Sequence, residues 1–405
     1  MTATADAVND IRDALASNQL TVVVGTGVTA AATGGTATAT WRGLIEHGIA
    51  RCESSGARDK AWADRARADA NSRYDLDRIV AAEKATDGLG GRGSPEYRQW
   101  LAEAVGGLRA TDTVVLDAIV AGADDGALIA TTNYDDVLAA ALGWDVVTWR
   151  DPTRLQRVLR GREQAVVHLH GHWKDPESVV FGASSYADVL RDPGAATFLK
   201  TTVYARTLLF VGFGAGLDDP NFSSLRRWMR AELSLSDYKH YRLVREPDIA
   251  AVRHAPEERI EVVSYGPDHH DLAPFLAALR SGVAARGMRG LDATPYNASY
   301  TKSAPGALPL PQRIPDPEAT RELLETAASL ARIAALAADP DETAAAAVAG
   351  GGDRLDEHRR FMFLFAEELA EVAQMAGRYA ELDSAATDHA LTWARRLAEI
   401  SRGEH

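Results

Sequence analysis

The chain is poor in cysteine, and no secretory signal is expected from its first residues. It contains one cysteine, Cys52, among 405 residues. A disulfide within the chain is therefore excluded, and so is a zinc site built from four cysteines. A reducing, cytoplasmic location is expected for such a chain. Residues 1–10 are acidic and small, without the basic start and apolar run of a secretory signal.

Positive charge and long apolar segments are also scarce. The net charge is −13, with 44 Lys and Arg against 57 Asp and Glu. This balance argues against broad, sequence-independent nucleic-acid binding, which needs surplus cations to neutralise phosphates. No stretch approaches the roughly 20 apolar residues that cross a bilayer, so no membrane partner is expected. The 46% hydrophobic content is that of an ordinary globular protein.

Five apolar, mostly β-branched runs end at or near glycine, and helical patterns lie between several of them. Continuous runs of this kind predict strands that are buried on both faces, as in parallel sheets. The alternation predicts an α/β fold with a doubly wound, Rossmann-like parallel sheet. The expected strands are 20–24, 126–133, 165–171, 207–214 and 260–266, and the expected helices include 5–17, 135–142, 222–233 and 272–283.

The length indicates more than one domain. We expect a nucleotide-binding domain over residues 1–288, with a helical insertion at about 55–110 that is rich in Ala, Arg and Asp. A proline-rich linker is expected over 289–317. Residues 318–405 have helical spacing and are expected to form a small module for self-association or partner binding.

The first glycine-rich motif, Gly25-Thr26-Gly27-Val28-Thr29, directly follows the first expected strand. Glycines at this place let the backbone approach a pyrophosphate, as in the dinucleotide-binding fingerprint. No lysine follows them, which argues against a Walker-type phosphate loop. Glu46 has nearly the spacing of a ribose-binding acid but lies in a helical pattern. A plain glycine turn remains an alternative.

Polar and glycine residues end two further strands. Thr132, Asn133 and Asp135 follow the second run, where they could hold a ribose or an amide; alternatively, Asn133 caps the next helix. Gly212-Phe213-Gly214 closes the fourth run. Two glycine-rich ends in one sheet indicate an extended ligand that lies across several strands, with two unrelated turns as the alternative.

A histidine is expected at the last position of the third run. Val166–His172 reads as a strand that stops at Gly171, and His170 would face the crevice where α/β sheets bind ligands. Histidine exchanges protons near neutral pH, so His170 is a candidate for chemistry. A core histidine is one alternative. Another is a metal site, because alternating His168, His170 and His172 would share one face of a strand.

Together these motifs resemble the sirtuin-like family, in particular the zinc-less bacterial NAD-hydrolysing effectors of antiphage defence. The resemblance extends over about residues 15–285. Its motifs are Val24–Thr29, Trp41, Thr131–Asp135, His168–Gly171, Val211–Gly214 and Asp219–Phe222.

The resemblance implies a Rossmann-like sheet with NAD as substrate and no zinc. It implies that His170 is the catalytic histidine, that Asn133 lies near the nicotinamide ribose, and that Asp135 lies near the carboxamide. The NAD-binding residues that it implies are Gly25, Thr26, Gly27, Val28, Thr29, Trp41, Thr132, Gly212, Phe213, Gly214 and Tyr265.

The expected activity is hydrolysis of NAD to nicotinamide and ADP-ribose, in a regulated defence effector that depletes NAD. The resemblance also implies a homo-oligomer, activated by a hexameric DNA-translocating ATPase or another defence component. The single cysteine argues against protein deacylation, because deacylases of this family carry a four-cysteine zinc module. A non-catalytic sensor of NAD or ADP-ribose that regulates a partner is the main alternative, followed by the metal-dependent hydrolase.

Overall fold

The computed structural model describes residues 2–72, 75–214, 220–252 and 254–280. The expected linker at 289–317 and the expected module at 318–405 lie outside these residues. In the described part of the chain, every helix is too short or too polar to cross a lipid bilayer.

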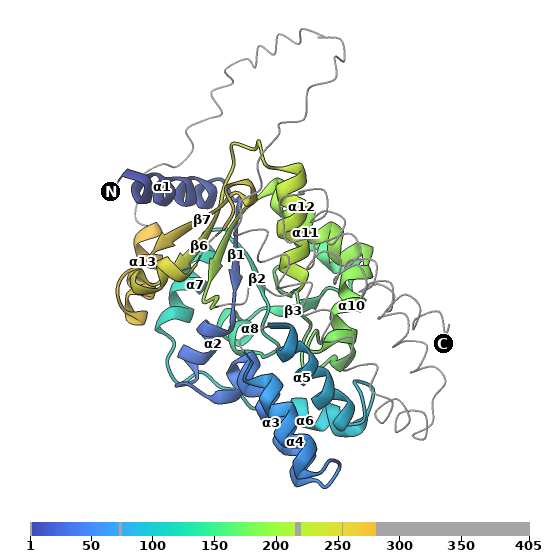
Figure 1. The fold of residues 1–405 in the computed structure, drawn as a ribbon. Coiled ribbons are helices and arrows are strands. Elements are labelled where there is room, and N and C mark those ends of the chain that lie inside the picture. The colour runs from blue at the N-terminus through green and yellow to red at the C-terminus, as the bar shows by residue number, and fades with distance from the viewer. Residues whose placement is uncertain (1, 73–74, 215–219, 253, 281–405) are drawn as a thin grey trace, which may run out of the picture. The chain divides into compact units, whose positions relative to one another are not determined.

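The described strands form one seven-stranded sheet in which every pairing is parallel (Figure 1). The strand order is β3-β4-β2-β1-β5-β6-β7. The predicted α/β, Rossmann-like fold is confirmed. The strands are β1 (Leu20–Val24), β2 (Leu128–Thr131), β3 (Asp145–Thr148), β4 (Ala165–His168), β5 (Thr207–Val211), β6 (His240–Val244) and β7 (Ile260–Ser264).

Helices cover both faces of the sheet, which is why β1 is buried along its whole length. Val22 and Val24 pack in a core with α1, α2, α7, α8 and α13, whereas Val23 packs in a second core with α9, α11 and α12. The helices are α1 (Thr2–Ala16), α2 (Thr26–Ala32), α3 (Trp41–Ser54), α4 (Lys60–Ala70), α5 (Asp75–Gly88), α6 (Pro95–Ala104), α7 (Val114–Asp124), α8 (Val137–Leu142), α9 (Pro152–Leu159), α10 (Ala183–Arg191), α11 (Pro193–Ala205), α12 (Pro220–Glu232) and α13 (Leu272–Arg280).

Several helices begin directly after a polar residue whose side chain caps the first turn. The side chains of Asp59, Ser94, Asp151 and Asp192 each accept a hydrogen bond from a backbone N–H in the first turn of the helix that follows. Three of these caps precede a proline, which needs no N–H partner at that position. Residues 55–110 hold α4, α5 and α6, and these helices group with α3 (Figure 1).

Two strands were not predicted, and four of the five predicted strands, β2, β4, β5 and β7, are shorter than the runs that predicted them. β3 is a four-residue, half-exposed edge strand, and in β6 the buried His240 and Arg242 interrupt the apolar run. The prediction that His170 is a strand residue is wrong, because β4 ends at His168. Gly171, at φ +82°, then turns the chain in the left-handed region that favours glycine.

The two glycine-rich segments meet where the strand order reverses, between β1 and β5. The Gly25 N–H donates to the Val211 carbonyl at 2.8 Å, and the Gly27 N–H donates to the Gly212 carbonyl at 3.0 Å. A Cβ added to Gly25 would lie 2.7 Å from the Gly212 oxygen. The segments therefore form one unit, and the alternative of two unrelated turns is wrong.

This close approach predicts that Gly25→Ala destabilises the protein by about 1–3 kcal/mol, because the methyl group forces the two backbones apart. Gly214→Ala is the matched control, since a Cβ there meets no atom of the described residues within 4 Å, and its effect is expected to stay within about 0.5 kcal/mol. Denaturant unfolding of both variants measures the difference. Equal destabilisation by the two substitutions would contradict the inferred contact.

Candidate active site

The carboxyl ends of four neighbouring strands bring the predicted site residues to one edge of the sheet. In the parallel register, Val24 of β1 pairs with Thr131 of β2 and Val211 of β5, and Thr131 also pairs with His168 of β4. Asn133 and His170 each follow their paired strand residue by two positions. The sheet edge at a reversal of strand order is where open α/β sheets bind ligands.

Asn133 is held by both the first glycine-rich segment and α2. Its Nδ2 donates to the Gly25 carbonyl at 3.2 Å and to the Thr29 hydroxyl at 2.8 Å. The alternative that Asn133 caps the next helix is wrong, because α8 begins at Val137 and Asp136 occupies the N-cap position. Asn133 Oδ1 is buried and accepts no hydrogen bond from the described residues.

Asp135 lies beside Asn133 and shares its hydroxyl partner. The Thr29 hydroxyl donates to Asp135 Oδ2 at 3.1 Å, and the Val137 N–H donates to Oδ1 at 2.9 Å. Burial raises the pKa of Asp135 from 3.8 to about 6, although both hydrogen bonds oppose that shift. A carboxylate kept ionised at neutral pH in a buried place is costly, and such groups cluster at functional sites.

His170 lies between aromatic rings of two helices. Its ring centroid is 5.8 Å from that of Tyr186 on α10 and 6.1 Å from that of Phe222 on α12. Burial lowers the pKa of His170 from 6.5 to about 4, so the imidazole is neutral at neutral pH. Neither aromatic residue was among the predicted site residues, because each reaches the site from a helix remote in sequence.

The remaining predicted residues differ in how close they come to this edge. Thr26, Val28, Thr132 and Phe213 belong to the segments that follow β1, β2 and β5. Trp41 begins α3 and is half-buried against the core. Tyr265 follows β7, which β6 separates from β5, and its hydroxyl is 3.0 Å from His269 Nδ1.

Residues 127–265 match a family model described as a SIR2-like domain. This chain carries a SIR2-like domain. The expected sirtuin-like family is thereby confirmed. The SIR2-like match covers Asn133, Asp135, His170 and the Gly212 segment. SIR2-like domains bind NAD, so the match indicates an NAD-related activity.

Among the described residues, the ring nitrogens of the three alternating histidines do not come close enough together to share one metal ion. His168 Nδ1 is 2.8 Å from the Asn133 carbonyl, and His172 Nε2 is 3.0 Å from Asp136 Oδ1. Because the strand ends at His168, His170 does not continue its alternation and lies between Tyr186 and Phe222 instead. The geometry therefore gives the metal-dependent alternative no support.

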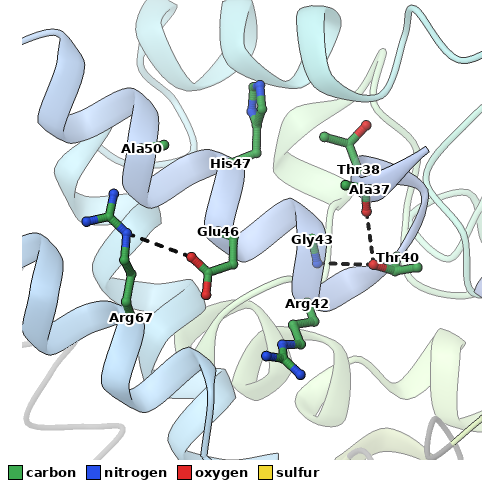
Figure 2. Close-up of a pocket in the computed structure, with 9 residues that line it drawn as sticks. All are labelled: Ala37, Thr38, Thr40, Arg42, Gly43, Glu46, His47, Ala50 and Arg67. Atoms are coloured by element: carbon green, nitrogen blue, oxygen red, sulfur yellow. Dashed lines mark hydrogen bonds and ion pairs between the residues drawn. The ribbon is translucent and has the colours of Figure 1, made fainter. Parts of the chain in front are cut away.

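A pocket of about 610 Å³ lies along α3 rather than at the strand ends. Figure 2 shows Arg67 and Glu46 on its wall, 3.9 Å apart between Nε and Oε2. Arg67 also pairs with Glu53 at 2.6 Å, and Arg42 donates to Asn71. Arg42, Glu46 and Arg67 of this pocket each already have a polar partner, so we assign no ligand to it.

Asp135→Asn is expected to stabilise the domain at about pH 8 by about 2 kcal/mol. The native pKa of Asp135 is raised to about 6, so its stability contribution is complete below the unfolded value of about 4 and is lost as the pH rises through 6. Asparagine carries no charge and avoids that loss. Thermal unfolding of both proteins from about pH 4 to 8 measures it.

The control for this prediction is Asp136→Asn, because the effect of this substitution on stability is expected to change with pH in the opposite direction. The pKa of Asp136 is lowered by its bonds to Trp173 and Lys174, which outweigh burial, so its stabilising contribution is lost as the pH falls. A difference in stability between Asp135→Asn and the wild-type protein that stays constant across the pH range would rule out the buried charge.

Proposed function

We propose that the SIR2-like domain is an NAD glycohydrolase that converts NAD and water to nicotinamide, ADP-ribose and a proton. The observation that carries the proposal is Asn133 Oδ1, a buried acceptor without a donor among the described residues, beside the ionisable Asp135. A buried polar atom of this kind is costly unless a ligand satisfies it. A ribose hydroxyl of NAD supplies such a donor.

Three side chains have separate roles in the proposed reaction. The bond between nicotinamide and ribose breaks through an oxocarbenium-like transition state, and nicotinamide departs neutral without a general acid. His170, neutral at neutral pH, accepts the proton of the attacking water directly or through a ribose hydroxyl. Asn133 orients the water or the ribose, and ionised Asp135 accepts the carboxamide N–H and favours the developing positive charge.

The rest of NAD is assigned to the two glycine-rich segments. Gly25, Thr26 and Gly27 line the phosphates, where the missing side chains allow close approach. Gly212 and Gly214 face the adenosine half, and a Cβ added to Gly214 would meet no atom of the described part of the chain within 4 Å. The family resemblance adds contacts to NAD from Val28, Thr29, Trp41, Thr132, Phe213 and Tyr265.

Access to the site requires movement. His170 is only 4% exposed, so the groups that cover its imidazole must separate from it when NAD enters. Exclusion of water suits this reaction, because it strengthens the electrostatic interaction of Asp135 with the positive charge that develops on the ribose in the transition state.

The biological setting proposed here follows the resemblance. An unrestrained NAD hydrolase would exhaust the cell, so the activity is expected to be off until triggered. We propose an antiphage-defence effector that assembles as a homo-oligomer through residues 318–405 and is activated by a partner, such as a hexameric DNA-translocating ATPase. Deletion of residues 318–405 that leaves assembly state and activity unchanged would contradict the role of that module.

The first test is nicotinamide release from NAD by the full-length chain, alone and with the products of neighbouring genes. His170→Ala is expected to lower turnover by about 10²–10⁴-fold, because the reaction loses its base. His270→Ala is the control, since that side chain is 80% exposed and lies in no proposed contact. Near-normal turnover of His170→Ala would remove the assignment. NAD binding without nicotinamide release would favour the sensor alternative.

The pH profile of kcat/KM separates the two titrating groups. We expect activity to fall as the pH drops below about 6, because Asp135 then becomes protonated. In Asp135→Asn we expect a lower maximal kcat/KM. We expect the fall of kcat/KM at acid pH to move toward pH 4, where His170 gains its proton. An acid limb that is unchanged in Asp135→Asn would contradict the role of the ionised carboxylate.

A further inference from the structure

The residues from the end of β4 onward are hydrogen-bonded to the loop that carries Asn133 and Asp135. We call residues 168–174 the histidine segment and residues 132–136 the asparagine loop. His168 Nδ1 lies 2.8 Å from the Asn133 carbonyl, and the Trp173 N–H donates to the Tyr134 carbonyl at 3.0 Å. The two segments are therefore joined at successive backbone carbonyls of the asparagine loop.

The far end of the asparagine loop is held by side chains of the same segment. Asp136 Oδ1 is 3.0 Å from His172 Nε2 and 3.1 Å from Lys174 Nζ, and Oδ2 accepts from Trp173 Nε1 at 2.8 Å. Asn133 and Asp135 turn instead toward Thr29. The side chains of Asn133 and Asp135 thus lie toward the proposed NAD site, whereas the side chain of Asp136 and the backbone carbonyls of Asn133 and Tyr134 bond to the histidine segment.

The bond from His168 to the loop has a defined direction. A backbone carbonyl only accepts, so His168 carries its proton on Nδ1 and donates it to Asn133. The side chain is completely buried, and burial lowers its pKa to about 3, so the ring is neutral at neutral pH. This donor is therefore present throughout the pH range in which the proposed reaction runs.

We propose that His168 is a positioning residue that fixes Asn133 relative to His170. His168 and His170 lie two residues apart in one segment, and the hydrogen bond from His168 ties Asn133 to that segment. The side chain of Asn133 is tied at its other end to Gly25 and Thr29. This inference rests on the proposed NAD hydrolysis and adds the residue that sets its geometry.

The test compares His168→Asn with His168→Leu. Both side chains are of similar size and leave the same space where the ring was, but only asparagine places an N–H donor near the position of Nδ1. We expect kcat for nicotinamide release to be about tenfold lower in His168→Leu than in His168→Asn, because one hydrogen bond is lost. KM is expected to agree within about twofold, since the contacts assigned to the phosphates remain.

Amide hydrogen exchange of the asparagine loop gives a readout independent of activity. We expect faster exchange over residues 132–136 in His168→Leu than in His168→Asn, with melting temperatures that match. If His168→Leu does not fold, His168→Gln replaces it. The amide of glutamine lies one bond farther from the backbone than that of asparagine, near the position of His168 Nε2 rather than Nδ1.

Equal kcat in the two folded variants, or equal exchange of the loop, would overturn the positioning role. Absence of nicotinamide release by the wild-type protein with its activators would instead refute the proposed function. In that case the exchange difference alone still supports or overturns the role of His168.

Discussion

The backbone contact between the ends of β1 and β5 is the constraint on which the proposed site depends. Gly27 donates to the Gly212 carbonyl, and Gly25 leaves no room for a side chain between the two segments. The same Gly25 offers its carbonyl to Asn133, which anchors the end of β2. Three strand ends are thus tied together before any ligand contributes.

The site also keeps polar groups in places that cost stability. Asp135 has a raised pKa and His170 a lowered one, both because burial disfavours the charged form. A protein retains such groups where function requires them, and the proposed chemistry needs a neutral base and an anionic carboxylate at the same pH.

Agreement between sequence and structure was best where local rules apply. Continuous apolar runs marked β1 and β5, because strands covered on both faces need apolar side chains throughout. The pattern missed β6, where His240 and Arg242 are buried with polar partners supplied by other parts of the chain. It also overextended β4, since Gly171 ends the run but does not reveal where pairing stops.

The sequence by itself determined the fold class, the glycine-rich strand ends and the residue types that gather there, because strand periodicity and glycine turns are local properties. Only the tertiary structure decided what those residues do to one another. Asn133 bonds to Gly25, 108 residues away, instead of capping a helix, and His168 bonds through Nδ1 to the backbone carbonyl of Asn133. Burial and partner choice depend on how parallel strands align, and no local pattern records that alignment.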